Sequence, residues 1–192
     1  MINEIYFKEF PVLESERLLL RKLNMTDSQE LQIIRSDERV MKYMDSERHT
    51  TLEFSENFVS ENLAMYTQKR GLFWAIIEKS SQSFLGDFVF RKIDSKNSRA
   101  EIGYTLKPEF WGKGFMKEAM TEIINFGFNQ FKLHSIEANI NPKNDNSRGI
   151  LKKMGFQKEA YFRENYFFNG NYLDSEIYSL LKVDFKLKKE DL

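Results

Sequence analysis

Hydrophobic positions recur along the chain with two periods, one typical of strands and one typical of helices. Alternating or continuous apolar runs bounded by polar turns predict strands over residues 17–23, 72–78, 84–93, 100–106 and 135–140. Apolar positions three or four residues apart predict helices over 52–69 and 115–131. Two short helices are also expected, one after the N-cap candidate Thr26-Asp27 and one over 146–154, which Gly155 ends.

The order of these elements constrains the topology. Short polar turns separate the three strands between residues 72 and 106, so these strands predict an antiparallel meander. The strand over 100–106, the helix over 115–131 and the strand over 135–140 form a crossover, which requires a parallel pair inside the sheet. The sequence therefore predicts a mixed α/β (α+β) fold.

A hairpin is expected near the end of the chain. Strands over 157–166 and 172–181 flank Asn169-Gly170, a dipeptide that favours a tight turn between antiparallel strands. The lysine-rich end, residues 186–190, is expected to be a solvated tail. Because no linker, repeat or low-complexity segment divides the chain, residues 1–192 are expected to form one domain.

Composition excludes several classes of function. Lys plus Arg and Asp plus Glu each number 29, so no global positive field exists to collect nucleic acid or an anionic membrane. The chain has no cysteine, which excludes disulfides, thiolate metal sites and a cysteine nucleophile. Neither His49 nor His134 has a second metal ligand at a recognisable spacing, so no metal is expected. Without a signal-peptide or membrane-span pattern, a cytoplasmic location is expected.

The segment that carries candidate chemistry is a strand, a break at Pro108, two glycines and a helix. Gly112 and Gly114 allow a sharp turn that points backbone N–H groups outward at the positive end of the helix dipole. A phosphate or pyrophosphate is the natural ligand of such a cradle. Its groups would come from residues 112–117, namely Gly112, Lys113, Gly114, Phe115, Met116 and Lys117.

Two other phosphate loops do not fit these residues. A dinucleotide-binding fingerprint needs a third glycine where Lys117 stands, and a P-loop needs Ser or Thr where Gly114 stands. An unrelated nucleotide-binding module is therefore disfavoured. For two glycines alone, a tight loop before a buried helix remains the alternative.

Several motifs in order resemble the GNAT acetyltransferases. They are residues 100–104 (AEIGY), 111–119 (WGKGFMKEA), 141–147 (NPKNDNS) and 151–156 (LKKMGF). The opening residues 13–21 (LESERLLLR) and the closing residues 169–181 resemble more narrowly the branch of ribosomal-protein-alanine N-acetyltransferases. Many relatives carry Gly or Ala where this chain has Met116. The resemblance spans about residues 13 to 185.

This resemblance implies a GNAT fold with a central, mostly antiparallel sheet of about seven strands, flanked by helices and splayed at a parallel pair. It also implies acetyl-CoA as co-substrate. The backbone of Tyr104, Thr105 and Leu106 would pair with the pantetheine arm, and residues 112–117 would hold the pyrophosphate. Asn144 and Ser147 match an Asn-x-x-Ser element that lies beside the thioester in relatives, although a turn-forming role for Asn144 is the alternative.

Direct attack of an amine on the thioester is expected, because no cysteine is present to form an acyl-enzyme. Glu101 is the first candidate for the general base, since it begins a strand that splays toward the thioester and resembles a glutamate found there in relatives. A solvated carboxylate is the alternative. Glu137 is the second candidate, with Asn139 and Asn141 on the same face by alternation.

The general acid is less well defined. Many relatives have a tyrosine at the position of Leu151, so that acid is absent here. Ser147 is the nearest hydroxyl by motif and is the candidate donor to the leaving thiolate. A serine at the start of a helix can equally satisfy backbone N–H groups.

The acceptor is not identified by any motif. The resemblance implies a protein N-terminal amine of the ribosomal-protein-alanine type, with polyamines, amino sugars or amino acids as alternatives. Specificity is expected in the two early helices and the last hairpin. A non-catalytic acyl-CoA-binding module is the alternative from another class, and either a monomer or a homodimer is compatible with the sequence.

Overall fold

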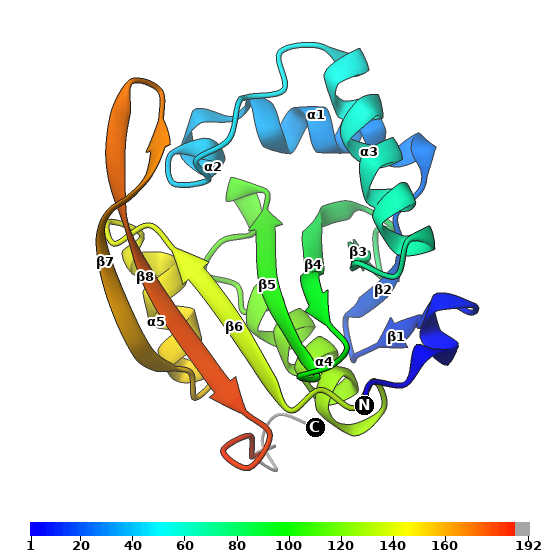
Figure 1. Ribbon diagram of the computed structural model, residues 1–192. Helices are drawn as coiled ribbons and strands as arrows, with labels where there is room; N and C mark the ends of the chain where they lie inside the picture. Colours follow the sequence, from blue (N-terminus) through cyan, green and yellow to red (C-terminus); the bar gives the residue numbers. More distant parts are fainter. Residues whose placement is uncertain (187–192) are drawn as a thin grey trace.

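The computed structural model describes residues 1–186 and contains one mixed sheet with helices on both faces (Figure 1). The sheet has eight strands in the order β1-β2-β3-β4-β5-β6-β8-β7, and only β5 and β6 are parallel. The strands are β1 (Leu13–Glu14), β2 (Leu18–Lys22), β3 (Leu72–Glu78), β4 (Phe84–Asp94), β5 (Arg99–Leu106), β6 (Ser135–Ile140), β7 (Gln157–Phe168) and β8 (Asn171–Leu181). About seven were expected, and the additional one is the two-residue β1, which is too short to leave a pattern.

The helices confirm the expected order and add short elements. They are η1 (Glu4–Phe7), η2 (Met25–Asp27), α1 (Ser28–Ser36), α2 (Glu38–Met41), α3 (Leu52–Thr67), η3 (Pro108–Phe110), α4 (Phe115–Asn129) and α5 (Asp145–Lys153). Asp27 does precede α1, but its carboxylate accepts the N–H of Asn24 and pairs with Arg21 instead of capping α1. The α2 helix was not predicted, because four residues do not establish a helical period.

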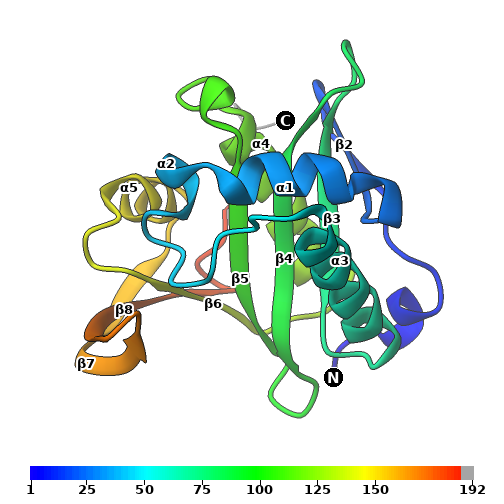
Figure 2. The ribbon, with the colours of Figure 1, turned by 90° about the horizontal axis from the view of Figure 1, so that it is seen from above.

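Two hydrophobic layers hold the sheet between the helices. The larger lies between the sheet and α4, where its aromatic residues include Trp74, Phe90 and Phe126. The smaller lies under α1 and α3 and contains Leu31, Ile34, Val59 and Phe73. Figure 2 shows α1 and α3 on one side of the central strands and α4 on the other. This explains why β3 reads as a continuous apolar run: it is covered on both faces.

The two parallel strands separate along their length. Paired positions run from Arg99↔Ser135 to Ile102↔Ala138, after which β5 continues to Leu106 and β6 to Ile140. Figure 1 shows the resulting V, closed at the bottom and open toward α2. Since parallel strands end at the same edge of a sheet, α4 and α5 both begin near the open end.

The end of the described chain agrees with its pattern. The turn between β7 and β8 has positive φ at Asn169 (47°) and Gly170 (79°), as a two-residue type I′ hairpin requires. Of the expected lysine-rich tail, residues 187–190 lie outside the described part. Within residues 1–186, no helix is both long enough and apolar enough to cross a membrane.

Candidate active site

The loop before α4 has the geometry of an anion cradle. Gly112 and Gly114 have φ of 73° and 83°, which favours glycine at both positions. No side chain of the described residues caps the start of α4, and a Cβ added at Gly112 would meet no atom within 4 Å. Phe115 and Met116 bury their side chains, so they offer only backbone N–H groups. The loop therefore fits a pyrophosphate bound by backbone N–H groups.

The opening segment of the chain braces this cradle, which sequence reasoning missed. Glu118 accepts hydrogen bonds from the Ser15 hydroxyl (2.6 Å) and from the Arg17 backbone N–H and Nε (2.9 and 2.7 Å). Burial acts to raise the pKa of Glu118, but the hydrogen bonds from Ser15 and Arg17 hold it below its ordinary value. Arg17 also donates to the Lys113 carbonyl (3.2 Å) and lies over the Phe115 ring. The Arg17 cation, which immediately precedes β2, thus lies beside the cradle.

The half of β5 that pairs with β4 but no longer with β6 contains the three residues expected along the pantetheine arm. Tyr104 and Leu106 face the layer with α4, while Thr105 faces the opposite side and donates to Asp87. All three lie beyond Ile102, where the pairs with β6 end. The Trp111 indole donates to the Leu106 carbonyl (2.8 Å) and joins the cradle loop to the strand end. Contact with a cofactor stays a prediction for each of them.

Asn144 and Ser147 have distinct positions at the start of α5. The Asn144 side chain caps the helix by accepting the Ser147 backbone N–H (3.0 Å). Ser147 is therefore not the capping residue, and its hydroxyl instead lies 2.7 Å from the Tyr104 hydroxyl. Burial raises the pKa of Tyr104 to about 12. Leu151 is fully buried in the core.

The two candidate bases are neighbours on adjacent strands. Glu101 and Glu137 are paired in register, on the face opposite α4. Glu101 is only 4% exposed, so the solvated alternative does not apply. Its carboxylate binds Arg91 (2.6 Å) and Lys92 (2.7 Å), whereas Glu137 is half-buried and lies 3.8 Å from Arg99. Glu101 lies where β5 is still paired, next to the origin of the splay.

A second buried polar cluster was not anticipated. Arg35 of α1 lies 3.5 Å from Asp87 of β4, and both are buried. Burial raises the pKa of Asp87 and lowers that of Arg35. Because Thr105 also donates to Asp87, the cluster ties α1 to the strand at the splay. Only proximity in space brings these residues together, so no local signal marks them.

The two histidines have separate surroundings. The His49 ring nitrogen Nδ1 lies 2.8 Å from the Ser55 hydroxyl, and burial, reinforced by the charge of Arg35, lowers its pKa to about 4. His134 connects α4 to β6, and its backbone N–H donates to the Ser98 carbonyl. Among residues 1–186, no group of three or more His, Cys, Asp or Glu could hold a metal ion.

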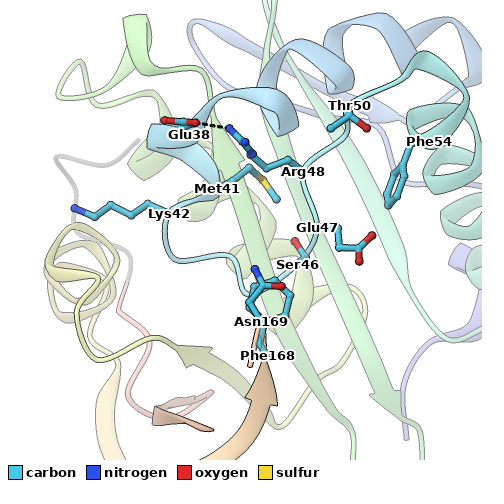
Figure 3. Close-up of a pocket in the computed structure, with 10 residues that line it drawn as sticks. All are labelled: Glu38, Met41, Lys42, Ser46, Glu47, Arg48, Thr50, Phe54, Phe168 and Asn169. Carbon is cyan, nitrogen blue, oxygen red and sulfur yellow. Dashed lines mark hydrogen bonds and ion pairs between the residues drawn. The ribbon is translucent and has the colours of Figure 1, made fainter. Parts of the chain in front are cut away.

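A pocket of about 540 Å³ lies between α2, the loop after it, the start of α3 and the tip of the β7–β8 hairpin (Figure 3). Its lining residues are Glu38, Met41, Lys42, Ser46, Glu47, Arg48, Thr50, Phe54, Phe168 and Asn169. The Tyr166 hydroxyl donates to Asp45 and ties the hairpin to the loop. Both ribbon views place α2 over the region between the end of β5 and α5.

Residues 17–157 match the family described as the Acetyltransferase (GNAT) domain. The chain belongs to the GNAT acetyltransferase family. It is 34% identical to the uncharacterized N-acetyltransferase YoaA of Bacillus subtilis, over 90% of this chain and 98% of that protein. A GNAT-family acetyltransferase structure from Bacillus anthracis has a TM-score of 0.80 at 29% identity, covering 90% of this chain and 99% of that one.

The expected branch is also represented. The [ribosomal protein uS5]-alanine N-acetyltransferase of Escherichia coli is 26% identical over 62% of each chain. Family membership confirms the expected fold, the N-acetyltransferase activity and acetyl-CoA as co-substrate. The features that fit acetyl-CoA in this chain are the backbone cradle at Gly112 and the splay beside Tyr104. Neither feature indicates which amine accepts the acetyl group.

Proposed function

We propose that this enzyme acetylates the N-terminal amine of a protein, bound in the pocket between α2 and the hairpin. The observation that carries the proposal is the balance of charge in the pocket. Its four charged residues are two of each sign, and Glu38 is already paired with Arg48 (2.6 Å). A polyamine carries several ammonium groups and needs several carboxylates free to bind them. A polypeptide N-terminus brings one ammonium group followed by neutral amides.

The cofactor and the acceptor occupy different parts of the site in this proposal. Bound acetyl-CoA supplies an acetyl thioester to the splay. The backbone N–H groups from Gly112 to Lys117, with Arg17 and Lys113 beside them, hold its pyrophosphate, and Tyr104 to Leu106 align the pantetheine arm. The side chains of the pocket orient the amine. The expected cytoplasmic location and the choice between monomer and homodimer remain predictions.

Glu101 remains the first candidate for the base and Glu137 the second. Both carboxylate oxygens of Glu101 accept hydrogen bonds from cations, so proton transfer to Glu101 requires exchange of one partner or an intervening water. Glu137 is more accessible and has one distant cationic partner. Their common face lies toward α1 and α3, on the side of the pocket.

An acceptor panel tests the proposal. Release of CoA from acetyl-CoA is measured with four acceptors. They are a peptide that begins with alanine, a lysine-containing version of that peptide with a blocked N-terminus, spermidine, and an amino sugar. We expect turnover with the free α-amine and at least tenfold less with the others. Faster turnover with spermidine would overturn the assigned acceptor class. Binding of acetyl-CoA without release on any amine would instead favour an acyl-CoA-binding module.

A further inference from the structure

The β7–β8 hairpin exposes aromatic side chains that an isolated chain has little reason to keep in water. Among residues 1–186, four of the six exposed aromatic side chains belong to this hairpin. They are Tyr161 (46% exposed), Phe162 (48%), Phe167 (61%) and Tyr172 (66%). Single exposed apolar side chains are ordinary, but several on one element mark a surface that another molecule covers. These rings therefore indicate an interface.

The same hairpin also provides the long edge of the sheet. The strand order ends with β1 on one side and β7 on the other, and Figure 1 shows β7 at the outer side. The β1 strand has two residues, whereas β7 has twelve. An edge strand presents N–H and C=O groups that can pair with a further strand. Of the two edges, β7 thus offers much the larger one to a partner.

The charges along the middle of β7 are complementary to themselves when the strand is reversed. The four charged residues in this part are Lys158, Glu159, Arg163 and Glu164. Suppose that a second β7 strand runs antiparallel to the first about a two-fold axis at Tyr161. Glu159 then faces Arg163 of the other strand, and each such contact occurs twice. Lys158 likewise faces Glu164. Opposite charges at facing positions stabilise a strand pair, and like charges destabilise it.

We propose that β7 pairs antiparallel with β7 of a second copy of this chain, about a two-fold axis at Tyr161. The pairing of β7 with β8 has two register shifts, and the three residues between them, 160–162, are regular. The proposed axis lies at the middle one of these three. Because the same strand serves both copies, the contact is closed and the assembly stops at two chains.

The side chains beside the axis are apolar. The Tyr161 ring faces its own copy, and Ala160 faces Phe162 of the other chain, so a small side chain leaves space for a large ring. The Tyr161 hydroxyl already donates to Asp174, which holds the ring in place. Pairing therefore removes half-exposed rings from water at the centre of the contact, while the charged residues flank them.

The contact between Glu159 and Arg163 is the more informative of the two charge pairs. Both residues are exposed, and the Ser179 hydroxyl donates to Glu159 (2.6 Å) and holds its carboxylate at the surface. Lys158, in contrast, already binds Glu176 (2.7 Å). One exposed ion pair contributes little by itself, so the rings supply most of the affinity and the charges fix the register.

Sedimentation equilibrium of the full chain tests the interface. We expect the wild type to be a dimer with a Kd of about 10 μM or lower. In Glu159→Arg or Arg163→Glu, like charges face each other twice, so the Kd should rise at least about tenfold. The double variant exchanges the two charges and should return to within about threefold of the wild type. Arg70→Glu, which reverses an exposed arginine between α3 and β3, is the matched control and should stay dimeric.

A mixture of the two single variants gives a second measurement. One chain is then positive at residues 159 and 163 and the other is negative at both, so the two should form a heterodimer although neither dimerises well alone. Circular dichroism checks that each variant is folded.

The outcomes each decide the proposal. A wild type that is monomeric at about 100 μM, tenfold above the expected Kd, would overturn it. A dimer that both single variants leave intact uses another surface and would overturn it as well. Dissociation of the single variants, without recovery in the double variant or in the mixture, would show that the axis is not at Tyr161. None of these results depends on which amine accepts the acetyl group.

Discussion

The proposed cofactor side and the proposed acceptor side of this enzyme use different parts of the polypeptide. The cradle at Gly112 and the end of β5 that no longer pairs with β6 offer backbone groups from one continuous stretch, residues 104–117. The proposed acceptor pocket uses side chains from segments that are more than one hundred residues apart, such as Lys42 and Phe168. Backbone sites depend on local conformation, whereas the pocket depends on how α2 and the hairpin pack. Substitutions should therefore separate the two functions cleanly.

The largest expected effect is loss of cofactor binding in Gly112→Asp. The new carboxylate would stand in the open space beside the cradle and repel the pyrophosphate, so we expect the Kd for acetyl-CoA to rise at least about a hundredfold. Calorimetry measures it. Gly112→Asn is the matched control, because asparagine has nearly the same shape and tolerates positive φ about as well. Equal affinities in the two variants would show that the loop is only a turn.

Glu101→Gln tests the acceptor face, and its effect should depend on pH. An α-amine with a pKa near 8 is about one-tenth neutral at pH 7, so a base should contribute near the low end of its usual range, about a hundredfold. We expect that loss in kcat/KM at pH 7 and little loss at pH 9 to 10, where the amine is already neutral. The pH profile of kcat/KM on an active amine measures both.

Glu137→Gln is the comparison for that experiment. If it loses activity that alkaline pH restores while Glu101→Gln follows the wild-type profile, Glu137 is the base. If both variants follow the wild type, neither carboxylate accepts the proton and catalysis depends on positioning. The affinity for acetyl-CoA should change little in either variant.

Tyr166→Phe should weaken binding of the acceptor, with a smaller effect than the variants described above. It removes the hydroxyl that donates to Asp45 and retains the ring, so the hairpin loses its hydrogen bond to the loop. We expect the KM for the acceptor to rise about threefold to tenfold, consistent with loss of one hydrogen bond, and the Kd for acetyl-CoA to stay unchanged. Tyr161→Phe is a control on the same hairpin, since Tyr161 donates to Asp174 of β8. A matching increase in both variants would argue against a specific tether.

The smallest effect concerns His49, which lies in the loop between α2 and α3. Its pKa is about 4 in the folded chain and about 6.5 when unfolded, so between these values the unfolded state binds the extra proton. Stability therefore falls as the pH decreases from 6.5 to 4. Over this pH interval, the Tm of His49→Asn should decline by about a few degrees less than the Tm of the wild type. If scanning calorimetry shows that the Tm of the wild type and of the variant decline equally, the pKa of His49 is not lowered in the folded state.

The sequence by itself determined the longer elements and the glycine loop before α4. Strand periodicity, the turn at Asn169-Gly170 and the glycines before α4 are local, since each depends on the conformations available to a few consecutive residues. The crossover from β5 to β6 then required the parallel pair, and this pair is the splay.

Only the tertiary structure decided what the side chains do. The pattern could not show that Glu101 is buried between Arg91 and Lys92. Both partners lie on the neighbouring strand β4, and the strand pairing has a register shift between Arg91 and Asp94. Nor could it show that Tyr104, expected only for its backbone, joins its hydroxyl to Ser147. Hydrogen bonds and ion pairs act over a few ångströms in space, and a sequence records no such distances between residues far apart along the chain.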